Sequence, residues 1–143
     1  GITKHTVETI IINSKPACIV FDQLDKIQGF SGDREDLRLG DIYIWARELA
    51  KKYCPVIGVC QSDASGEGKR WLTMDNVANA KTAKQAEADW IIGIGKTHNE
   101  SEEYQRFLSI CKNKLMGDED TEPMLRHGHL SVRILPDIAR FED

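Results

Sequence analysis

The residues best suited to chemistry follow two short apolar runs of the sequence. The run Cys-Ile-Val-Phe ends at Asp22, and the run over 56–60 ends at Gln61. Because an α/β sheet carries its functional groups at the carboxyl ends of its strands, both side chains are candidates for one site. Four apolar residues followed by Asp form the Walker B pattern, whose carboxylate holds the Mg²⁺ of a nucleoside triphosphate. An Asp at this place is also common as a turn cap, and the pattern alone leaves both interpretations open.

Gln61 offers an amide that both donates and accepts hydrogen bonds. If it stands at the level of Asp22 on the next strand, it could touch a γ-phosphate together with neighbouring groups. It would then report whether that phosphate is present. The plain alternative is a strand-end Gln that bonds to loop backbone.

A basic, glycine-containing stretch follows Gln61. In residues 62–70, Lys69 and Arg70 follow Gly66 and Gly68, which predicts a mobile loop able to meet a phosphate backbone. A solvated connection without a role is the alternative. The stretch is not a phosphate loop, because Asp63 stands where the pattern G-x-x-x-x-G-K-[ST] needs its first Gly, and Arg70 stands where it needs a hydroxyl.

A second pair of cations follows the apolar run over 107–111. Lys112 and Lys114 lie two residues apart, so on extended backbone both side chains point to the same side. They could converge on one anion from a neighbouring subunit. Strand-end lysines also serve solubility alone, and this alternative stays open.

The elements that must position these residues show in the hydrophobic pattern. The continuous apolar runs at 17–21 and 56–60 are typical of strands buried on both faces. Between them, apolar residues recur at spacings of three and four over 39–53, which predicts an amphipathic helix that ends before Pro55. Strand, helix and strand form a βαβ unit, and the class is α/β. Further expectations are a helix over 78–88 and strands at 90–94, 107–111 and 130–135.

Length and charge restrict the class of protein further. A chain of 143 residues predicts one domain, and its first strand is preceded by no βα unit, so we expect a truncated amino end. The 19 Lys and Arg against 23 Asp and Glu exclude a uniformly basic nucleic-acid coat. No apolar run nears the roughly 20 residues of a membrane span, and no secretory signal is present. These features predict a cytoplasmic protein.

The four cysteines are far apart in the sequence. None forms a C-x-x-C pair, so neither a zinc ribbon nor a thioredoxin-type site is supported. Because three of them lie in apolar runs, we expect reduced thiols in the core.

Taken in order, these pieces resemble the second half of the RecA-like motor domain of hexameric replicative helicases, the DnaB family and especially the phage primase-helicases. The resemblance covers about residues 15 to 143 and implies a RecA-like P-loop NTPase core, a mostly parallel sheet flanked by helices, as a partial domain without the Walker A loop and catalytic Glu. It rests on Ala-Cys-Ile-Val-Phe-Asp22-Gln-Leu, the helix ending Ala50-Lys-Lys-Tyr, Pro-Val-Ile-Gly-Val-Cys-Gln61, the segment from Asp75 to Asp89-Trp-Ile-Ile, and Ser-Ile-Cys-Lys112-Asn-Lys114.

The resemblance implies roles in ATP hydrolysis for four residues. Asp22 would be the Walker B ligand of Mg²⁺, and Gln61 would be the γ-phosphate sensor. Lys112 matches the strand-end lysine of the family, and Lys114 falls where the family has its trans-acting arginine finger. Lysine lacks the planar fork that grips a phosphate twice, so hydrolysis across the subunit interface should be slower or organised differently.

The resemblance also implies a DNA-binding surface. Lys69 and Arg70 match a loop of the central channel, and Lys81 and Lys84 match a second channel-facing loop and helix. All four are point charges without an aromatic stacking platform, so we expect electrostatic binding that does not read sequence.

The predicted function is thus part of an ATP-dependent, ring-shaped helicase that unwinds duplex DNA by translocating on one strand. Its partners would be single-stranded DNA, further copies in a hexameric ring, and a primase domain or protein. One alternative is a catalytically inactive RecA-like binding or scaffold module. Another is a different RecA-like ring ATPase, such as a recombinase, which would show strand exchange instead of duplex unwinding.

Overall fold

The computed structural model describes residues 1–79, 81–114 and 127–143, with the backbone but not the side chain of Lys81. Contacts between residues divide the chain into two compact units. Unit 1 comprises Gly1–Gln61 and Asn79–Ala88, and unit 2 comprises Ser62–Ala78 and Asp89–Asp143. The chain therefore leaves unit 1 after Gln61, returns to it for one short helix, and ends in unit 2.

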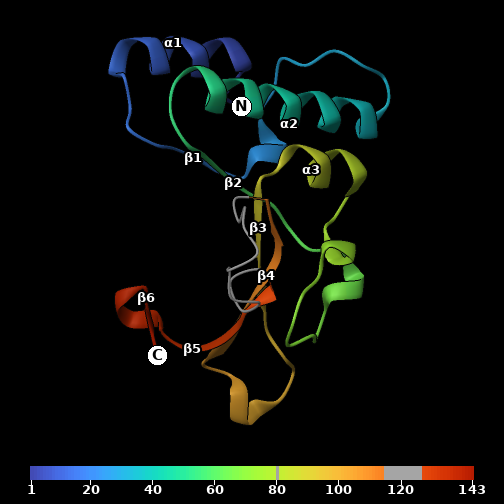
Figure 1. Cartoon of the computed structure of the whole chain (residues 1–143), viewed down its shortest axis with the longest axis vertical. Helices are drawn as coiled ribbons and strands as arrows, with labels where there is room; N and C mark the ends of the chain where they lie inside the picture. Colours follow the sequence, from blue (N-terminus) through green and yellow to red (C-terminus); the bar gives the residue numbers. More distant parts are fainter. Residues whose placement is uncertain (80, 115–126) are drawn as a thin grey trace. The chain divides into compact units, whose positions relative to one another are not determined.

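Unit 1 is built on the predicted βαβ arrangement (Figure 1). Strand β1 (Ile19–Asp22) is followed by the 3-10 helix η1 (Leu24–Lys26), helix α2 (Glu35–Lys52) and strand β2 (Val56–Val59). The two strands pair in parallel, with Ile19 opposite Val56 and Asp22 opposite Val59, which confirms the strand–helix–strand prediction. The unit also contains α1 (Lys4–Ser14) and α3 (Lys81–Glu87).

The core of unit 1 lies on one face of β1. Ile19 and Phe21 point to this face, where they meet the buried sides of α1 and α2, and Trp45 of α2 packs on Phe21 with ring centroids 5.7 Å apart. The opposite face keeps Val20 61% and Ile57 54% exposed. The expectation that both strands are buried on both faces is therefore wrong for the structure of this chain, because the helices that form the core cover one side.

Helix α1 was not predicted from the sequence. Its residues include many β-branched side chains, which favour strands, and its buried positions Val7 and Ile11 are one helical turn apart. Capping defines its ends: the Thr3 hydroxyl accepts a hydrogen bond from the backbone of Thr6, and Lys15 closes the helix in the left-handed conformation.

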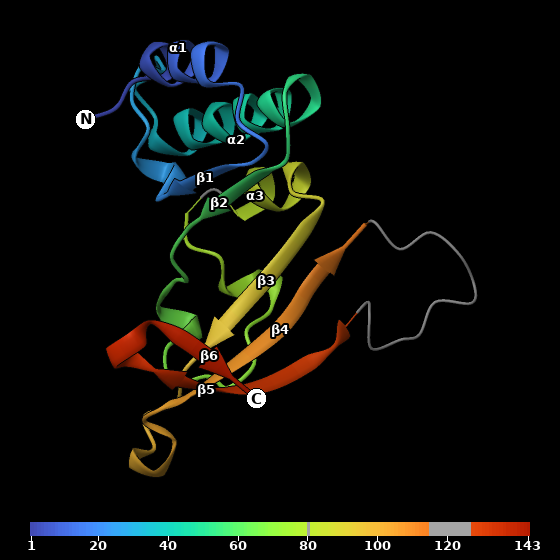
Figure 2. The same cartoon turned by 90° about the vertical axis from the view of Figure 1, so that its left-hand side faces the viewer.

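Unit 2 is an antiparallel sheet in the order β3-β4-β5-β6 (Figure 2). The strands are β3 (Trp90–Gly95), β4 (Gln105–Asn113), β5 (His129–Leu135) and β6 (Arg140–Glu142). The predicted strands at 90–94, 107–111 and 130–135 are confirmed, whereas a mostly parallel sheet is not: among the described strands only β1 and β2 are parallel.

The four free cysteines differ in burial. Cys18 and Cys60 are exposed, Cys111 is half-buried, and Cys54 is half-buried against the core of unit 1. The expectation of core thiols is therefore wrong for Cys18 and Cys60. Within the described ranges, no helix has the length and apolar character needed to cross a membrane.

The packing of α2 leads to a stability prediction. Ile42 is fully buried at 0% exposure, and Ile44 of the same helix is 49% exposed. We expect Ile42→Ala to lower the free energy of unfolding by about 2–5 kcal/mol, because it leaves a cavity among close-packed side chains. Ile44→Ala should cost no more than about 1 kcal/mol. Urea unfolding followed by circular dichroism measures both, and equal losses would contradict this assignment of the core.

Candidate functional site

Asp22 and Gln61 meet at one edge of the parallel pair in unit 1. Asp22 is the last residue of β1, and its side chain is exposed on the face opposite the core. It lies opposite Val59, so Gln61 stands two residues beyond it, about 7 Å further along an extended chain. Gln61 is also exposed. The structure thus brings the two residues to the same carboxyl edge, with both polar groups open to a ligand.

The donor set at this edge suits Mg²⁺ bound to a phosphate more than a metal held by protein alone. In the described part of the chain, no group of three or more His, Cys, Asp or Glu side chains could hold a metal ion. Mg²⁺ keeps several waters and commonly takes one or two carboxylates together with substrate phosphates. The exposed carboxylate of Asp22 fits that mode of binding.

A polar cluster around the buried Lys84 includes Asp25, three residues after Asp22. Asp25 of η1 accepts two hydrogen bonds, one from the hydroxyl of Tyr43 at 2.8 Å and one from the ammonium of Lys84 at 2.5 Å. The Lys84 ammonium also lies 5.2 Å from the centroid of the Tyr43 ring. Burial first, then Cys60 and the bond to Asp25, raise the pKa of Tyr43, so its hydroxyl keeps its proton and donates.

This cluster corrects the expectation for Lys84. Only 3% of its side chain is exposed, and the ammonium that would meet a DNA phosphate is paired with Asp25. A buried lysine needs such a partner, and this one lies 59 residues away in the sequence. The predicted DNA contact of Lys84 is therefore not supported by its surroundings. Lys81 begins α3, and its side chain lies outside the described part of the chain.

The basic stretch after Gln61 belongs to unit 2 and is tied together at its base. A bridge pairs Ser62 with Val77, and the backbone N–H of Asp63 donates to the carbonyl of Asn76 at 2.8 Å. The buried amide of Asn76 donates to Ser65 and caps the turn that begins at Thr73. The mobile stretch expected from the sequence is thus a closed loop with a fixed base.

The far side of this loop rests on a glycine strip of β3. A Cβ atom on Gly95 would lie 2.1 Å from the carbonyl oxygen of Arg70, and one on Gly93 would lie 2.7 Å from Leu72. Ser109 of β4 donates to the carbonyl of Leu72 at 2.7 Å. The sequence signal for this contact is the alternation of glycine with large apolar residues in Trp-Ile-Ile-Gly-Ile-Gly, which was not used above.

The two cations of the loop differ in their surroundings. Lys69 is exposed. Arg70 forms an ion pair with Glu102, and its guanidinium lies 5.1 Å from the centroid of the Phe107 ring. The hydrogen bond from Thr97 first, and then Arg70, lower the pKa of Glu102, so its carboxylate stays charged. Lys69 is therefore the cation open to a phosphate. Arg70 could contact a phosphate only if its ion pair with Glu102 broke, or if its guanidinium bound both groups.

The residue after these cations is aromatic, although the loop was expected to lack a stacking platform. Trp71 stacks on His129, with centroids 4.2 Å apart and the rings 3° from parallel. It also packs edge-on against Phe107. One face of the indole is therefore already covered by a ring of the same unit.

The second cation pair lies at the end of β4 in unit 2. Lys112 is half-buried in the strand opposite Ile91, and Lys114 is exposed just after the strand. The backbone N–H of Lys114 donates to the carbonyl of Asp89 at 2.9 Å. Both residues therefore lie beside the start of β3, and β4 runs two residues beyond the predicted strand over 107–111, so only Lys114 follows it.

One further segment of unit 2 matches only the end of the phosphate-loop motif. Gly95-Lys96-Thr97 matches the ending G-K-T, but Trp90 stands where the first glycine is needed. Gly95 ends a strand, a short 3-10 helix, η4 (Glu100–Glu102), follows, and the Thr97 hydroxyl donates to Glu102. These residues do not cradle a phosphate on a helix N-terminus.

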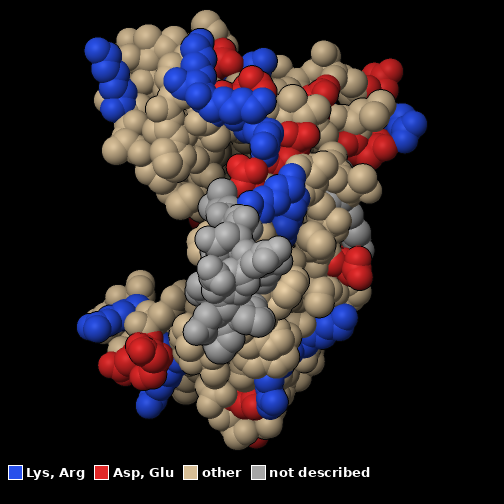
Figure 3. All heavy atoms as spheres, viewed as in Figure 1, with Lys and Arg blue, Asp and Glu red and all other residues tan. Residues whose placement is uncertain are grey.

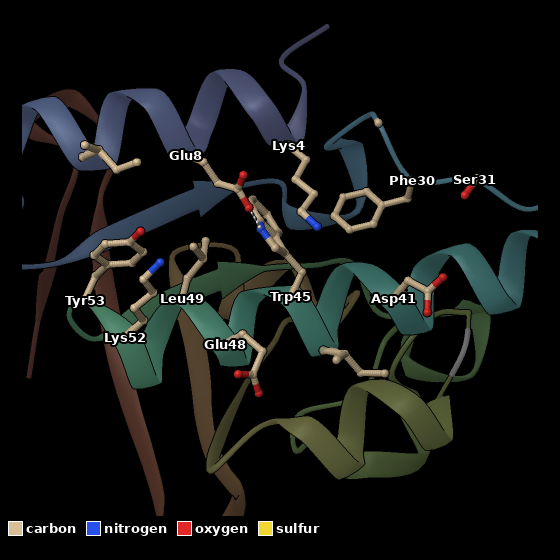
Figure 4. A pocket seen from close by; sticks show the side chains of 13 residues that line it. Lys4, Glu8, Phe30, Ser31, Asp41, Trp45, Glu48, Leu49, Lys52 and Tyr53 are labelled. Atoms are coloured by element: carbon tan, nitrogen blue, oxygen red, sulfur yellow. Dashed lines mark hydrogen bonds between the residues drawn. The ribbon is translucent and has the colours of Figure 1, made fainter.

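The groove of unit 1 lies away from these candidates. It measures about 630 Å³ and runs between α1 and α2, where Trp45 donates to Glu8 at 2.9 Å (Figure 4). Lys4 and Phe30 close one end, with the ammonium 5.6 Å from the ring centroid. No predicted site residue lines the groove.

Comparison with solved structures shows the fold. No family model matches the sequence, and neither does any curated protein. The ATPase domain of G40P matches 100% of this chain with a TM-score of 0.79 at 14% identity, and the chain covers 52% of it. A DnaB-like replicative helicase, described with its interactions with primase, matches 99% of this chain with a TM-score of 0.76 at 12% identity.

These similarities are structural, and the identities are low. The chain has the fold of part of a helicase ATPase domain, and it spans about half of the first chain and 36% of the second. The similarities agree with the α/β class predicted from the sequence and show the fold alone.

The glycine strip gives a prediction about the basic loop. We expect Gly95→Ala to lower the free energy of unfolding by about 1–3 kcal/mol, because the added methyl group overlaps the backbone of Arg70. Trypsin should then cleave after Lys69 or Arg70 at least about fivefold faster than in the wild type, because the loop is displaced.

Gly40→Ala is the matched control, since its Cβ would meet only the Ala83 methyl group at 3.6 Å. It should leave cleavage unchanged and stability equal or higher by up to about 1 kcal/mol. Wild-type cleavage in Gly95→Ala would show that the loop does not depend on the strip.

Proposed function

We propose that this chain is the carboxyl-terminal half of a RecA-like motor domain in a ring-forming, ATP-driven DNA helicase. The observation that carries the proposal is the placement of Asp22 and Gln61 at one carboxyl edge of the parallel pair, in a chain whose fold matches helicase ATPase domains over its length. That the two compact units belong to one motor domain is part of the proposal.

The nucleotide would bind at the edge formed by Asp22 and Gln61. Asp22 would hold Mg²⁺ together with waters and phosphate oxygens, and the ion would supply charge stabilisation for phosphoryl transfer to water. Gln61 has an amide that accepts from a water and donates to a γ-phosphate oxygen, so it responds to loss of that phosphate. The backbone cradle and lysine of a Walker A loop would come from a preceding segment.

Lys112 and Lys114 would act across a subunit interface. Lys112 lies within β4 and Lys114 directly follows this strand, so both would be held at a defined position when two copies meet. A lysine ammonium stabilises transition-state charge as a point charge and not as a bidentate fork. We expect one lysine ammonium to stimulate ATP hydrolysis in the neighbouring subunit, and the stimulation to depend on where that ammonium lies.

Single-stranded DNA would meet the loop that carries Lys69 and Arg70. Lys and Arg side chains lie interspersed with Asp and Glu over the face shown in Figure 3, so binding would rely on local cations repeated around a ring. Lys84 takes no part in this contact because it is buried. A hexameric ring and a primase partner belong to the proposal as well.

The nucleotide site is tested by Asp22→Asn in the full-length protein. We expect ATP hydrolysis to fall about 100-fold or more with the fold intact, because the change removes a metal-directed charge and keeps the shape. Asp33→Asn, in an exposed loop, is the matched control and should hydrolyse ATP like the wild type. Wild-type turnover in Asp22→Asn would refute the Walker B role and favour a scaffold module.

The DNA contact is tested by Lys69→Ala with Arg70→Ala. We expect weaker binding of single-stranded DNA for every sequence, and a salt dependence whose slope falls by about 0.7 for each lost phosphate contact. Lys51→Ala with Arg38→Ala removes the same charge from exposed positions of α2 and should keep the wild-type slope. Fluorescence anisotropy over a salt series measures both, and equal slopes for the two double variants would leave the loop without a DNA role.

A further inference from the structure

We propose that the buried cluster of Lys84, Asp25 and Tyr43 is a positioning device that couples α3 to the turn after Asp22. The inference rests on the proposed function and extends it to residues that touch neither nucleotide nor DNA. It assigns the three side chains to the communication between the DNA-binding loop and the site of hydrolysis.

The cluster joins three elements of unit 1 through one carboxylate. Lys84 comes from α3, Tyr43 comes from α2, and Asp25 belongs to η1, which begins two residues after Asp22. Both oxygens of Asp25 are used, Oδ1 by the Tyr43 hydroxyl and Oδ2 by the Lys84 ammonium. A shift of α3 relative to η1 therefore breaks the ion pair of a lysine whose side chain is only 3% exposed.

The cluster also reaches the strand end that carries Gln61. Cys60 interacts with the hydroxyl of Tyr43, and Gln61 is the next residue. The cluster is thus linked to both strand ends of the proposed nucleotide edge. Asp25 lies three residues after Asp22, and Cys60 is the residue before Gln61.

Chain connectivity links this cluster to the basic loop. The chain leaves unit 1 after Gln61, forms the loop with Lys69 and Arg70, and returns at Asn79, directly before α3. A force on the segment that leads from the loop back to unit 1 is therefore applied first to α3.

Helix α3 is a single helix of seven residues, so a pull on its first residue also moves Lys84. Its last residue, Glu87, is held to α2 separately, because the Arg47 guanidinium donates to the Glu87 carbonyl at 2.6 Å without touching Asp25. Breaking a buried ion pair leaves a charge without compensation, so α3, η1 and Tyr43 move together instead of separating. Movement of α3 then reaches the turn after Asp22.

The test uses the full-length protein and three sets of variants. Tyr43→Phe keeps the ring and removes the hydroxyl, and Lys84→Met removes the ammonium. The pair Lys84→Met with Asp25→Leu replaces the ion pair by apolar side chains of similar size, which keeps the interior free of an unpaired charge. Arg47→Met is the matched control, because it removes a cation from the same contact between α2 and α3 without touching Asp25.

We expect the ratio of DNA-stimulated to basal ATP hydrolysis to fall at least about fivefold in Tyr43→Phe and in the apolar pair. Basal turnover and the Kd for single-stranded DNA should stay within about twofold of the wild type, a range too small to explain that loss. Arg47→Met should keep the wild-type ratio. A cluster that serves stability alone would lower the melting temperature and leave the ratio unchanged.

The outcomes separate this inference from the proposed function. If the wild type hydrolyses ATP in a DNA-stimulated manner and the folded Tyr43→Phe and apolar-pair variants keep its ratio, the positioning role is wrong and the helicase proposal stands. If Lys84→Met alone does not fold, the other two variants decide. If the wild type shows no DNA-stimulated hydrolysis, the proposed function fails, and the inference fails with it.

Discussion

The parallel pairing of β1 and β2 is the constraint on which the proposed site depends. Ile19 and Phe21 pack into the core formed with α1 and α2, and this fixes which residues of β1 face the other side. Asp22 must then be exposed, and its register with Val59 puts Gln61 at the same edge. Because side chains alternate along a strand, a shift of one residue would turn Asp22 into the core.

Two kinds of contact hold the candidate elements in place, one in each unit. In unit 2, the backbone of the basic loop rests on a strand without side chains at Gly93 and Gly95, so the loop has a fixed position although Lys69 is exposed. In unit 1, α3 is held by a buried charge pair whose loss would be costly. Among the described residues, no buried side-chain nitrogen or oxygen lacks a hydrogen-bond partner.

The elements with strong periodicity could be predicted from the sequence, and their pairing partners could not. The amphipathic pattern of α2 and the apolar runs of β1 and β2 gave the βαβ unit. An apolar run does not show whether its strand pairs in parallel or antiparallel, so the antiparallel sheet of unit 2 was not predicted. Helix α1 was missed because its β-branched residues favour strands, while two buried positions and a Thr3 cap are enough to form it.

The candidate site shows the same limit. Asp22 and Gln61 were identified because strand ends are visible in the sequence, whereas Lys84 was misjudged because its partner Asp25 is distant in the chain. A polar residue on a predicted helix gives no sign of whether it meets solvent or a buried carboxylate.

Manganese binding reports on the proposed role of Asp22, because Mn²⁺ replaces Mg²⁺ at hard oxygen sites and is visible by electron paramagnetic resonance. The full-length protein would be titrated with Mn²⁺ in the presence of a non-hydrolysable ATP analogue. We expect one bound ion per subunit in the wild type and in Asp25→Asn, and an affinity at least about tenfold weaker in Asp22→Asn, because that variant alone loses the proposed ligand. Equal Mn²⁺ affinity in Asp22→Asn and the wild type would contradict this role.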